Sequence, residues 1–264
     1  FGFNGNANFP AISADGRYVA YSSDMDNWAT PGVDSNGVSD VFVYDRQTDT
    51  LEVIDLATDG AYSLVISADG RYVTFLKAGS IFVYDRQTST LENITVESGY
   101  GDAEWEPTDI SADGRYVAYY SYTTGAFSII LYDRQTNTLQ TIGGENGYDA
   151  YFPSLSDDGR YITFVTEDPN LVSGDTTDRD GFLYDVQWDT FTNLTMDVAN
   201  VVYWVNISAN GRYIVISVDG WYIYVYDRVN NTKKLIIDNG SYAYIGNSVN
   251  SISNDGSIVY KIGD

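Results

Sequence analysis

A ten-residue phrase occurs six times in this sequence. It reads ISADGRYVAY at Ile12, and its sixth and most diverged copy reads ISNDGSIVYK at Ile252. The Asp-Gly or Asn-Gly pairs inside successive copies start 54, 44, 45, 52 and 45 residues apart. Self-similarity at a period of this size predicts a fold of repeated structural units.

A second phrase follows each of the first five copies and ends in Tyr-Asp, as in VFVYDRQTDT and IYVYDRVNNT. Both phrases alternate with the period of two expected of strands. The Asp-Gly pairs supply the positive φ angles that tight hairpin turns require. Each repeat therefore predicts four strands, which we call a to d in chain order, with the Asp-Gly turn between a and b and the Tyr-Asp phrase in c. Four antiparallel strands per repeat predict an all-β chain folded as a six-bladed β-propeller.

We expect one propeller domain over residues 1–264 whose sixth blade is incomplete, because no Tyr-Asp phrase follows the last Asp-Gly pair. Residues 257–263 would then form an open edge, and residues 1–8 can supply one short strand at most. Three explanations stay open: the chain is cut short of its natural end, the blade is small, or a partner or neighbouring copy adds the strand. The expected blades cover about 8–59, 60–100, 101–145, 146–197, 198–240 and 241–264.

The combination of SADGRYVAY with a following VFVYDRQT resembles the TolB-type (WD40-like) propeller repeat, and it recurs along nearly the whole chain. The resemblance implies a six-bladed propeller with an interaction role, often periplasmic or extracellular in bacteria. TolB itself carries an α/β domain before its propeller, which no part of this sequence resembles. Prolyl-oligopeptidase relatives carry a hydrolase domain, but the sequence has no Gly-x-Ser-x-Gly elbow and no histidine.

The composition narrows the classes of partner. The formal net charge is −23, from 37 Asp and Glu against 14 Lys and Arg. Nucleic acids and anionic membranes attract clustered Lys and Arg, so we expect neither as a partner. Cys and His are both absent, which removes thiolate and imidazole ligands and the commonest general base. The acidity favours an extracellular or cell-surface protein, and the resemblance implies that a periplasmic location is also possible. No apolar run reaches the roughly 18–20 residues of a membrane-spanning helix, so we expect no membrane insertion.

Residues repeated in every blade are expected to be scaffold. The aspartates at the end of strand c should bind turn amides or pair with a repeat arginine. Three aromatic residues that lie four positions before the strand-a serine should pack between blades. The aspartates are Asp45, Asp85, Asp133, Asp185 and Asp227, and the aromatic residues are Phe9, Phe152 and Trp204.

Functional residues are expected where the blades differ, on the face that carries the b–c and d–a loops. The first and fourth blades have long b–c insertions rich in oxygen ligands, which Ca²⁺ prefers. Ordinary polar turns have the same composition, so this alternative stays open. The candidate calcium ligands are Asp34, Asn36 and Asp40 in the first insertion and Asp175, Asp178 and Asp180 in the fourth. The candidate binding-face aromatics are Trp28, Tyr100, Trp105, Tyr148, Tyr151, Tyr242 and Tyr244.

We therefore expect a non-catalytic scaffold that binds a protein or a glycan through this face and has no cofactor other than Ca²⁺. One alternative is a structural subunit of a surface assembly or filament, joined through the open sixth blade. Another is a polysaccharide-active enzyme, which needs two carboxyl groups about 5–10 Å apart. The loop GDAEWEPTD offers four such groups on one segment, Asp102, Glu104, Glu106 and Asp109.

Overall fold

The structure is a computed structural model of the chain. It describes residues 6–25, 37–55, 59–95, 109–123, 125–144, 147–175, 179–198, 201–238, 243–244, 252–259 and 261–262. The chain divides into two compact units, Phe1–Gly114 and Arg115–Asp264, and each is described by itself.

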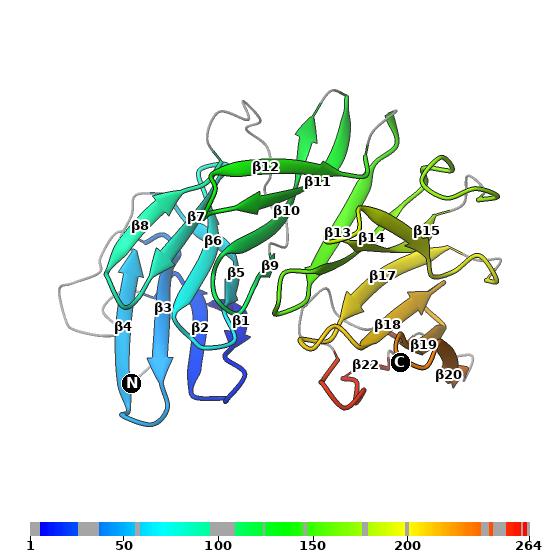
Figure 1. Cartoon of the computed structure of the whole chain (residues 1–264). Helices are drawn as coiled ribbons and strands as arrows, with labels where there is room; N and C mark the ends of the chain where they lie inside the picture. Colours follow the sequence, from blue (N-terminus) through cyan, green and yellow to red (C-terminus); the bar gives the residue numbers. More distant parts are fainter. Residues whose placement is uncertain are drawn as a thin grey trace. The chain divides into compact units, whose positions relative to one another are not determined.

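Each of the five repeats with a Tyr-Asp phrase forms one four-stranded antiparallel sheet with its strands in chain order (Figure 1). The first sheet is β1 (Ala7–Ile12), β2 (Tyr18–Ser23), β3 (Asp40–Asp45) and β4 (Thr50–Asp55). The second is β5 (Ala61–Ile66), β6 (Tyr72–Lys77), β7 (Ser80–Asp85) and β8 (Thr90–Asn93). The third is β9 (Asp109–Ile110), β10 (Tyr116–Thr123), β11 (Ala126–Asp133) and β12 (Thr138–Ile142).

The fourth sheet is β13 (Ala150–Leu155), β14 (Tyr161–Thr166), β15 (Asp180–Asp185) and β16 (Thr190–Asn193). The fifth is β17 (Val202–Ile207), β18 (Tyr213–Val218), β19 (Tyr222–Asp227) and β20 (Thr232–Asp238). In the sixth repeat β21 (Ala243–Tyr244) pairs with β22 (Lys261–Ile262), and Ile252 forms a bridge with Ile258. The predicted all-β class and four-stranded repeat are confirmed, while the number of blades and the open edge over 257–263 stay predictions.

Within the described ranges there is no helix. Accordingly, these ranges contain no long apolar helix of the kind that crosses a membrane.

The Asp-Gly turn between the first two strands of a repeat is built from its own side chains. In the first repeat the amide of Gly16 donates to the carbonyl of Ser13 at 2.8 Å, and Gly16 has φ 70°. The Ser13 hydroxyl donates to Asp15 Oδ1 at 2.6 Å and accepts the amide of Tyr18 at 3.0 Å. Only the glycine has a left-handed backbone, so the turn needs Asp for its side chain and Gly for its φ angle.

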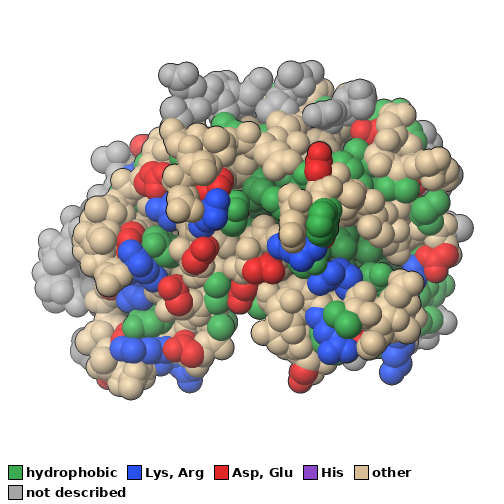
Figure 2. Space-filling view, viewed as in Figure 1, with side chains coloured by type: hydrophobic (Ala, Val, Ile, Leu, Met, Phe, Trp, Pro, Cys, Tyr) green, Lys and Arg blue, Asp and Glu red, His purple; other side chains and the backbone are tan. Residues whose placement is uncertain are grey.

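The arginine after this turn forms an ion pair with the aspartate at the end of the third strand. Arg17 Nη2 lies 2.7 Å from Asp45 Oδ2, and Asp45 Oδ1 also accepts the amide of Gln47 at 2.9 Å. The same pair recurs in all five complete repeats, which confirms that these aspartates pair with a repeat arginine. The other pairs are Arg71–Asp85, Arg115–Asp133, Arg160–Asp185 and Arg212–Asp227. Figure 2 shows acidic side chains beside basic ones at several places on the surface in view.

Apolar side chains form separate cores within each unit, between neighbouring sheets. In the first unit Ala20 and Val43 of the first sheet pack with Val73 and Phe75 of the second. In the second unit one core joins the third and fourth sheets, and another joins the fourth and fifth. The three aromatic residues predicted to pack between blades do so: Phe9 contacts Tyr62, and Phe152 contacts Trp204.

Candidate functional site

The second unit carries a cluster of six aromatic side chains at the end of its sheets where strands b and c connect. We call it the aromatic surface. Tyr151 lies at its centre, with its ring centroid 5.7 Å from Tyr120, 5.6 Å from Phe127 and 5.7 Å from Phe152. Edge-to-face and tilted pairs of this kind are favourable beyond the area that they bury. The members are Tyr120, Tyr122, Phe127, Tyr151, Phe152 and Trp204.

The aromatic surface is open to solvent at its margin. Tyr122 is 44% exposed, and the neighbouring Tyr203 of β17 is 40% exposed. Tyr122 reaches this position because β10 and β11 extend to eight residues each, two more than their counterparts β14 and β15. Its ring then packs edge-on against Phe127 at 5.3 Å. The result is an aromatic cluster that is buried at Tyr120 and reaches solvent at Tyr122.

Arg179 lies against this patch, at the start of β15. Its guanidinium carbon is 5.5 Å from the centroid of Tyr151 and 5.6 Å from that of Phe152. Burial lowers the pKa of Arg179, but an arginine stays charged at any physiological pH. Its Nε is buried and has no hydrogen-bond partner among the described residues. An unused donor on a buried cation is costly, so an acceptor that reached it would be held strongly.

Asp149 orients the central ring. The Tyr151 hydroxyl donates to Asp149 Oδ2 at 2.7 Å, and the amide of Phe127 donates to Asp149 Oδ1 at 2.8 Å. The Thr166 hydroxyl donates to the carbonyl of Asp149 at 2.8 Å. Both carboxylate oxygens are therefore used to hold the surface in one arrangement. This pre-organisation reduces the entropy that binding would cost.

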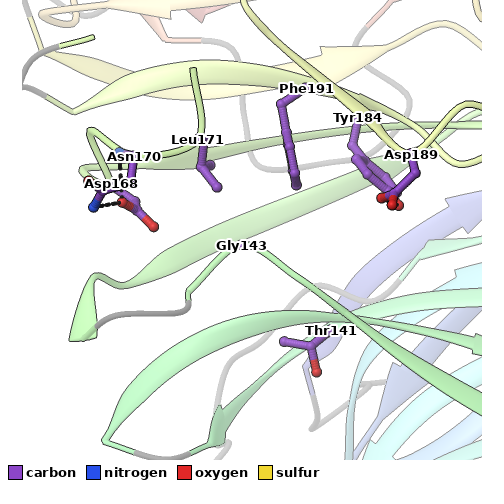
Figure 3. Close-up of a pocket in the computed structure, with 8 residues that line it drawn as sticks. All are labelled: Thr141, Gly143, Asp168, Asn170, Leu171, Tyr184, Asp189 and Phe191. Carbon is purple, nitrogen blue, oxygen red and sulfur yellow. Dashed lines mark hydrogen bonds between the residues drawn. The ribbon is translucent and has the colours of Figure 1, made fainter. Parts of the chain in front are cut away.

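A cavity of about 300 Å³ lies between the outer strands of the third and fourth sheets (Figure 3). Asp168 is fully buried there, and its Oδ1 accepts the amide and the Nδ2 of Asn170 at 2.9 and 2.8 Å. Asp168 Oδ2 has no partner among the described residues. The ring of Phe191 lies between the Asp168 end and the Tyr184–Asp189 end of the cavity in this view. Such a cavity can take a small ligand that combines an apolar face with hydrogen-bond donors.

The predicted calcium ligands are only partly within the described residues. Asp40 and Asp180 start β3 and β15 and are almost fully buried. Asp180 Oδ1 accepts the Thr195 hydroxyl at 2.5 Å, and Asp175 Oδ1 accepts Nδ2 of Asn193 at 2.8 Å. No group of three or more acidic residues suited to a metal occurs in the described part of the chain. Asp34, Asn36 and Asp178 lie outside it, so the calcium sites stay a prediction.

The predicted binding-face aromatics are likewise only partly described. Tyr151 is the centre of the aromatic surface, and half-buried Tyr148 precedes it on the approach to β13. Tyr244 lies in β21, and its side chain is not among those described. The role of these residues in binding stays a prediction. Outside the described residues lie Trp28, Tyr100, Trp105 and Tyr242.

The carboxylates considered for catalysis lie mostly outside the described residues as well. Asp109 is described: it is buried in β9, and its Oδ1 accepts the amide of Ile110 at 2.8 Å. The other three, which are Asp102, Glu104 and Glu106, precede the described part of this strand. The enzyme alternative therefore stays untested.

Sequence reasoning missed the most distinctive residue of the aromatic surface. That residue is Arg179, which no periodic pattern in the sequence relates to Tyr151. A signal for part of the surface was present in the third repeat, where SYTTGAF lengthens the b–c hairpin by two aromatic residues, Tyr122 and Phe127. The contact between Arg179 and the two rings depends on how the beginnings of β13 and β15 meet.

No protein-family model and no curated protein matches the sequence. Solved structures do match. TolB from Acinetobacter baumannii aligns with a TM-score of 0.59 and 18% identity over 88% of this chain and 54% of that protein. A protein described as TolB from Agrobacterium tumefaciens gives 0.58 and 17% over 88% and 80%. A prolyl endopeptidase gives 0.65 and 13% over 92% and 38%.

This chain thus spans about half the length of the Acinetobacter TolB. At these identities the likeness concerns the fold, and it agrees with the resemblance of the repeated phrases. The repeated four-stranded sheets and these alignments together show that the chain has the all-β fold of the TolB-type β-propellers.

Proposed function

We propose that this protein is a non-catalytic interaction scaffold that binds a partner protein through the aromatic surface and Arg179. One observation carries the proposal: a half-buried arginine lies over two aromatic rings with a buried Nε that no described residue uses. Tyr, Trp and Arg are the residues that dominate binding energy at protein interfaces. Rings held in place by Asp149 would bind with little loss of side-chain freedom.

The net charge of the chain indicates the charge that its partner should carry. A net charge of −23 steers basic partners toward the protein and repels acidic ones. At the contact itself, Arg179 requires a carbonyl or carboxylate acceptor. The partner is therefore basic overall, with an apolar or aromatic segment that carries one such acceptor. The TolB-type fold supports a place in the periplasm or at the cell surface.

A glycan is the second candidate partner, and the cavity at Asp168 favours it. The Phe191 ring can stack on a sugar face, and the buried Asp168 beside it has a carboxylate oxygen that no described residue uses. Binding of a glycan array by the wild-type protein and loss of that binding in Asp168→Asn would support this candidate. If the wild-type protein binds no glycan on the array, a partner protein is the remaining candidate.

The test of the main proposal compares matched variants of two surfaces. Arg179→Gln and Tyr122→Ala change the aromatic surface, whereas Trp188→Ala removes a more exposed aromatic residue on a c–d turn. A partner would be isolated by cross-linking to the wild-type protein in its native compartment, and its affinity for each purified variant measured by calorimetry. We expect Arg179→Gln to weaken binding about tenfold or more and Trp188→Ala to leave it unchanged.

Folding of each variant would be checked by its thermal melt, so that a loss of binding is not a loss of structure. Equal affinity of the wild type and Arg179→Gln would contradict the proposal. The proposal would also be contradicted if Tyr122→Ala bound the partner with the affinity of the wild type and Trp188→Ala bound it more weakly.

A further inference from the structure

A long connection between β14 and β15 provides one wall of the cavity at Asp168. It runs over residues 167–179, whereas turns of two or three residues join the same strands in the second, third and fifth sheets. Asp168, Asn170 and Leu171 of this connection line the cavity, together with residues of the fourth sheet and of the third repeat (Figure 3). The whole described lining lies in the second unit. The cavity is therefore a feature of the fourth repeat and its neighbour within one unit.

The two oxygens of the Asp168 carboxylate are used unequally. Oδ1 accepts both the amide and Nδ2 of Asn170, so both of its lone pairs are occupied. Oδ2 is buried, has no partner among the described residues and points away from Asn170 in Figure 3. No Lys or Arg in the described part of the chain forms an ion pair with Asp168. Burial of an uncompensated carboxylate is costly, and a donor that reached Oδ2 would be held strongly.

The turn that Asp168 forms does not need the charge of its side chain. Both bonds from Asn170 end on Oδ1, and an asparagine at position 168 has the same oxygen to accept them. The negative charge and Oδ2 are thus not required for the local structure. This favours a cationic ligand as the counterpart of the charge.

The rest of the lining suits an aliphatic chain. Leu171 and the ring of Phe191 present apolar surface along the cavity from the Asp168 end (Figure 3). At the far end the Tyr184 hydroxyl donates to Asp189 Oδ1 at 2.7 Å, so its proton is already used. The volume of about 300 Å³ is at the lower end of the range for small-molecule sites. A short chain of methylene groups matches both the size and the apolar surface.

We propose that this cavity binds a primary ammonium group carried on an aliphatic chain, with the ammonium at Asp168 and the chain along Phe191. The ammonium supplies the charge and the donor that Oδ2 lacks. A guanidinium fits less well, because it pairs with both oxygens of a carboxylate and Oδ1 is already used. A calcium ion fits less well, because it needs six to eight oxygen ligands and much of this lining is apolar.

Two sources can supply this group, a free aliphatic diamine or a lysine side chain of the partner protein, and only the lysine source rests on the proposed function. Hydrogen bonds connect the cavity to the aromatic surface. The amide of Asp168 donates to the Thr166 hydroxyl at 3.2 Å, and this hydroxyl donates to the carbonyl of Asp149, whose carboxylate orients Tyr151. One partner can therefore contact both sites. A lysine also agrees with a partner that is basic overall.

The test uses small probes that differ only in the charged group. Pentane-1,5-diamine and Nα-acetyl-lysine amide carry the ammonium, and pentane-1,5-diol and Nα,Nε-diacetyl-lysine amide are their neutral counterparts. NMR titration of the whole chain would give the dissociation constant of each probe. We expect both ammonium probes to bind and their neutral counterparts to bind about tenfold more weakly or less, the usual effect of losing a charged hydrogen bond.

Asp168→Asn keeps the acceptor for Asn170 and removes the charge. It should weaken the binding of both ammonium probes about tenfold or more, without lowering the melting temperature, because an unpaired buried charge is removed. A purely structural role of Asp168 would leave probe binding unchanged. Arg179→Gln should not affect the probes, so a failure of this proposal can be told from a failure of the proposed function.

Asp189→Asn separates the two sources and keeps the acceptor for the Tyr184 hydroxyl, as Asn137 and Asn231 do in other repeats. A free diamine with its second ammonium at Asp189 should bind this variant more weakly than the wild type, and the lysine probe should bind both alike. If the source is a lysine of the partner protein, Asp168→Asn should weaken the partner's affinity about tenfold, and the diamine should compete with the partner.

Three results would overturn the proposal. Absence of any chemical-shift change with both ammonium probes would show that the cavity does not take this group. Equal affinities of the diamine and the diol would show that the charge is not recognised, and would favour a glycan as the ligand of the cavity. Equal affinities of the ammonium probes for the wild type and Asp168→Asn would place their binding elsewhere on the protein.

Discussion

Single tyrosine hydroxyls hold the turn between the third and fourth strands of a repeat. The Tyr44 hydroxyl donates to Asp49 Oδ1 at 2.6 Å, and this bond raises the pKa of Tyr44. Asp49 has φ 57°, a left-handed conformation that Asp and Asn tolerate better than other non-glycine residues. Three other repeats use the same bond, in Tyr132–Asn137, Tyr184–Asp189 and Tyr226–Asn231.

The second repeat has Ser89 at this position, with φ 55°. Ser89→Asp should raise the free energy of unfolding by about 0.5–1 kcal/mol, because aspartate suits the backbone and can accept from the Tyr84 hydroxyl. Ser89→Ala is the control, since alanine offers neither advantage, and it should not stabilise the protein. Urea unfolding of the three proteins measures the difference, and a less stable Ser89→Asp variant would refute the argument.

At the scale of the element, each Asp-Gly turn serves two functions. Within its own sheet the glycine provides the left-handed backbone that joins the first two strands. From the second repeat on, the bare Cα of the glycine also gives room for the tyrosine ring of the preceding sheet. A glycine in this turn can therefore be required for its φ angle alone or for its φ angle and its size together.

Gly16 and Gly70 separate the two requirements, because their φ angles are 70° and 73°. Gly16→Ala should cost about 1 kcal/mol of stability from backbone strain. Gly70→Ala adds the displacement of Tyr18 and should cost about 2–4 kcal/mol. Guanidinium unfolding of both variants gives the comparison. Equal losses would mean that the Gly70–Tyr18 contact contributes nothing to stability.

At the scale of the whole molecule, five Arg–Asp pairs make stability depend on acid pH. The arginine partner and the turn amides lower the pKa of Asp85 and of Asp133 to about 2. The same contacts lower the pKa of Asp45 and Asp227 further still. A carboxylate with a lowered pKa in the folded state stabilises the protein above its unfolded pKa of about 4. That contribution is lost as the pH falls through the folded pKa.

The melting temperature should therefore fall steeply between about pH 4 and pH 2, where the five aspartates take up protons on unfolding. Asp85→Asn removes one of these groups. It should lower the melting temperature at pH 7, where the ion pair is intact, and make the decline below pH 4 shallower. Thermal melts at pH 7, 4, 3 and 2 test this. Parallel curves for Asp85→Asn and the wild type would show that the Asp85 ion pair is not a source of acid lability.

The repeated phrases were enough to predict the strands, the turns and the blade-like unit. These features depend on nearby residues only. The alternation of apolar and polar residues determines each strand, and the Asp-Gly pair determines the position of each turn. The scaffold role of Asp45 and its counterparts could also be predicted, because a residue repeated in every unit cannot form a single site. Of the aromatic surface, only Tyr151 was predicted as a binding residue, because it stands out in an irregular segment.

The remaining features were decided by tertiary structure. Arg179 becomes a binding candidate because the start of β15 brings it against two rings of β13, and nothing in its own segment records that contact. The turn at Gly16 likewise has the same local sequence as the turn at Gly70. Gly70 receives the ring of Tyr18 from the preceding sheet of the same unit, which is a property of packing between sheets and not of the residues in the turn.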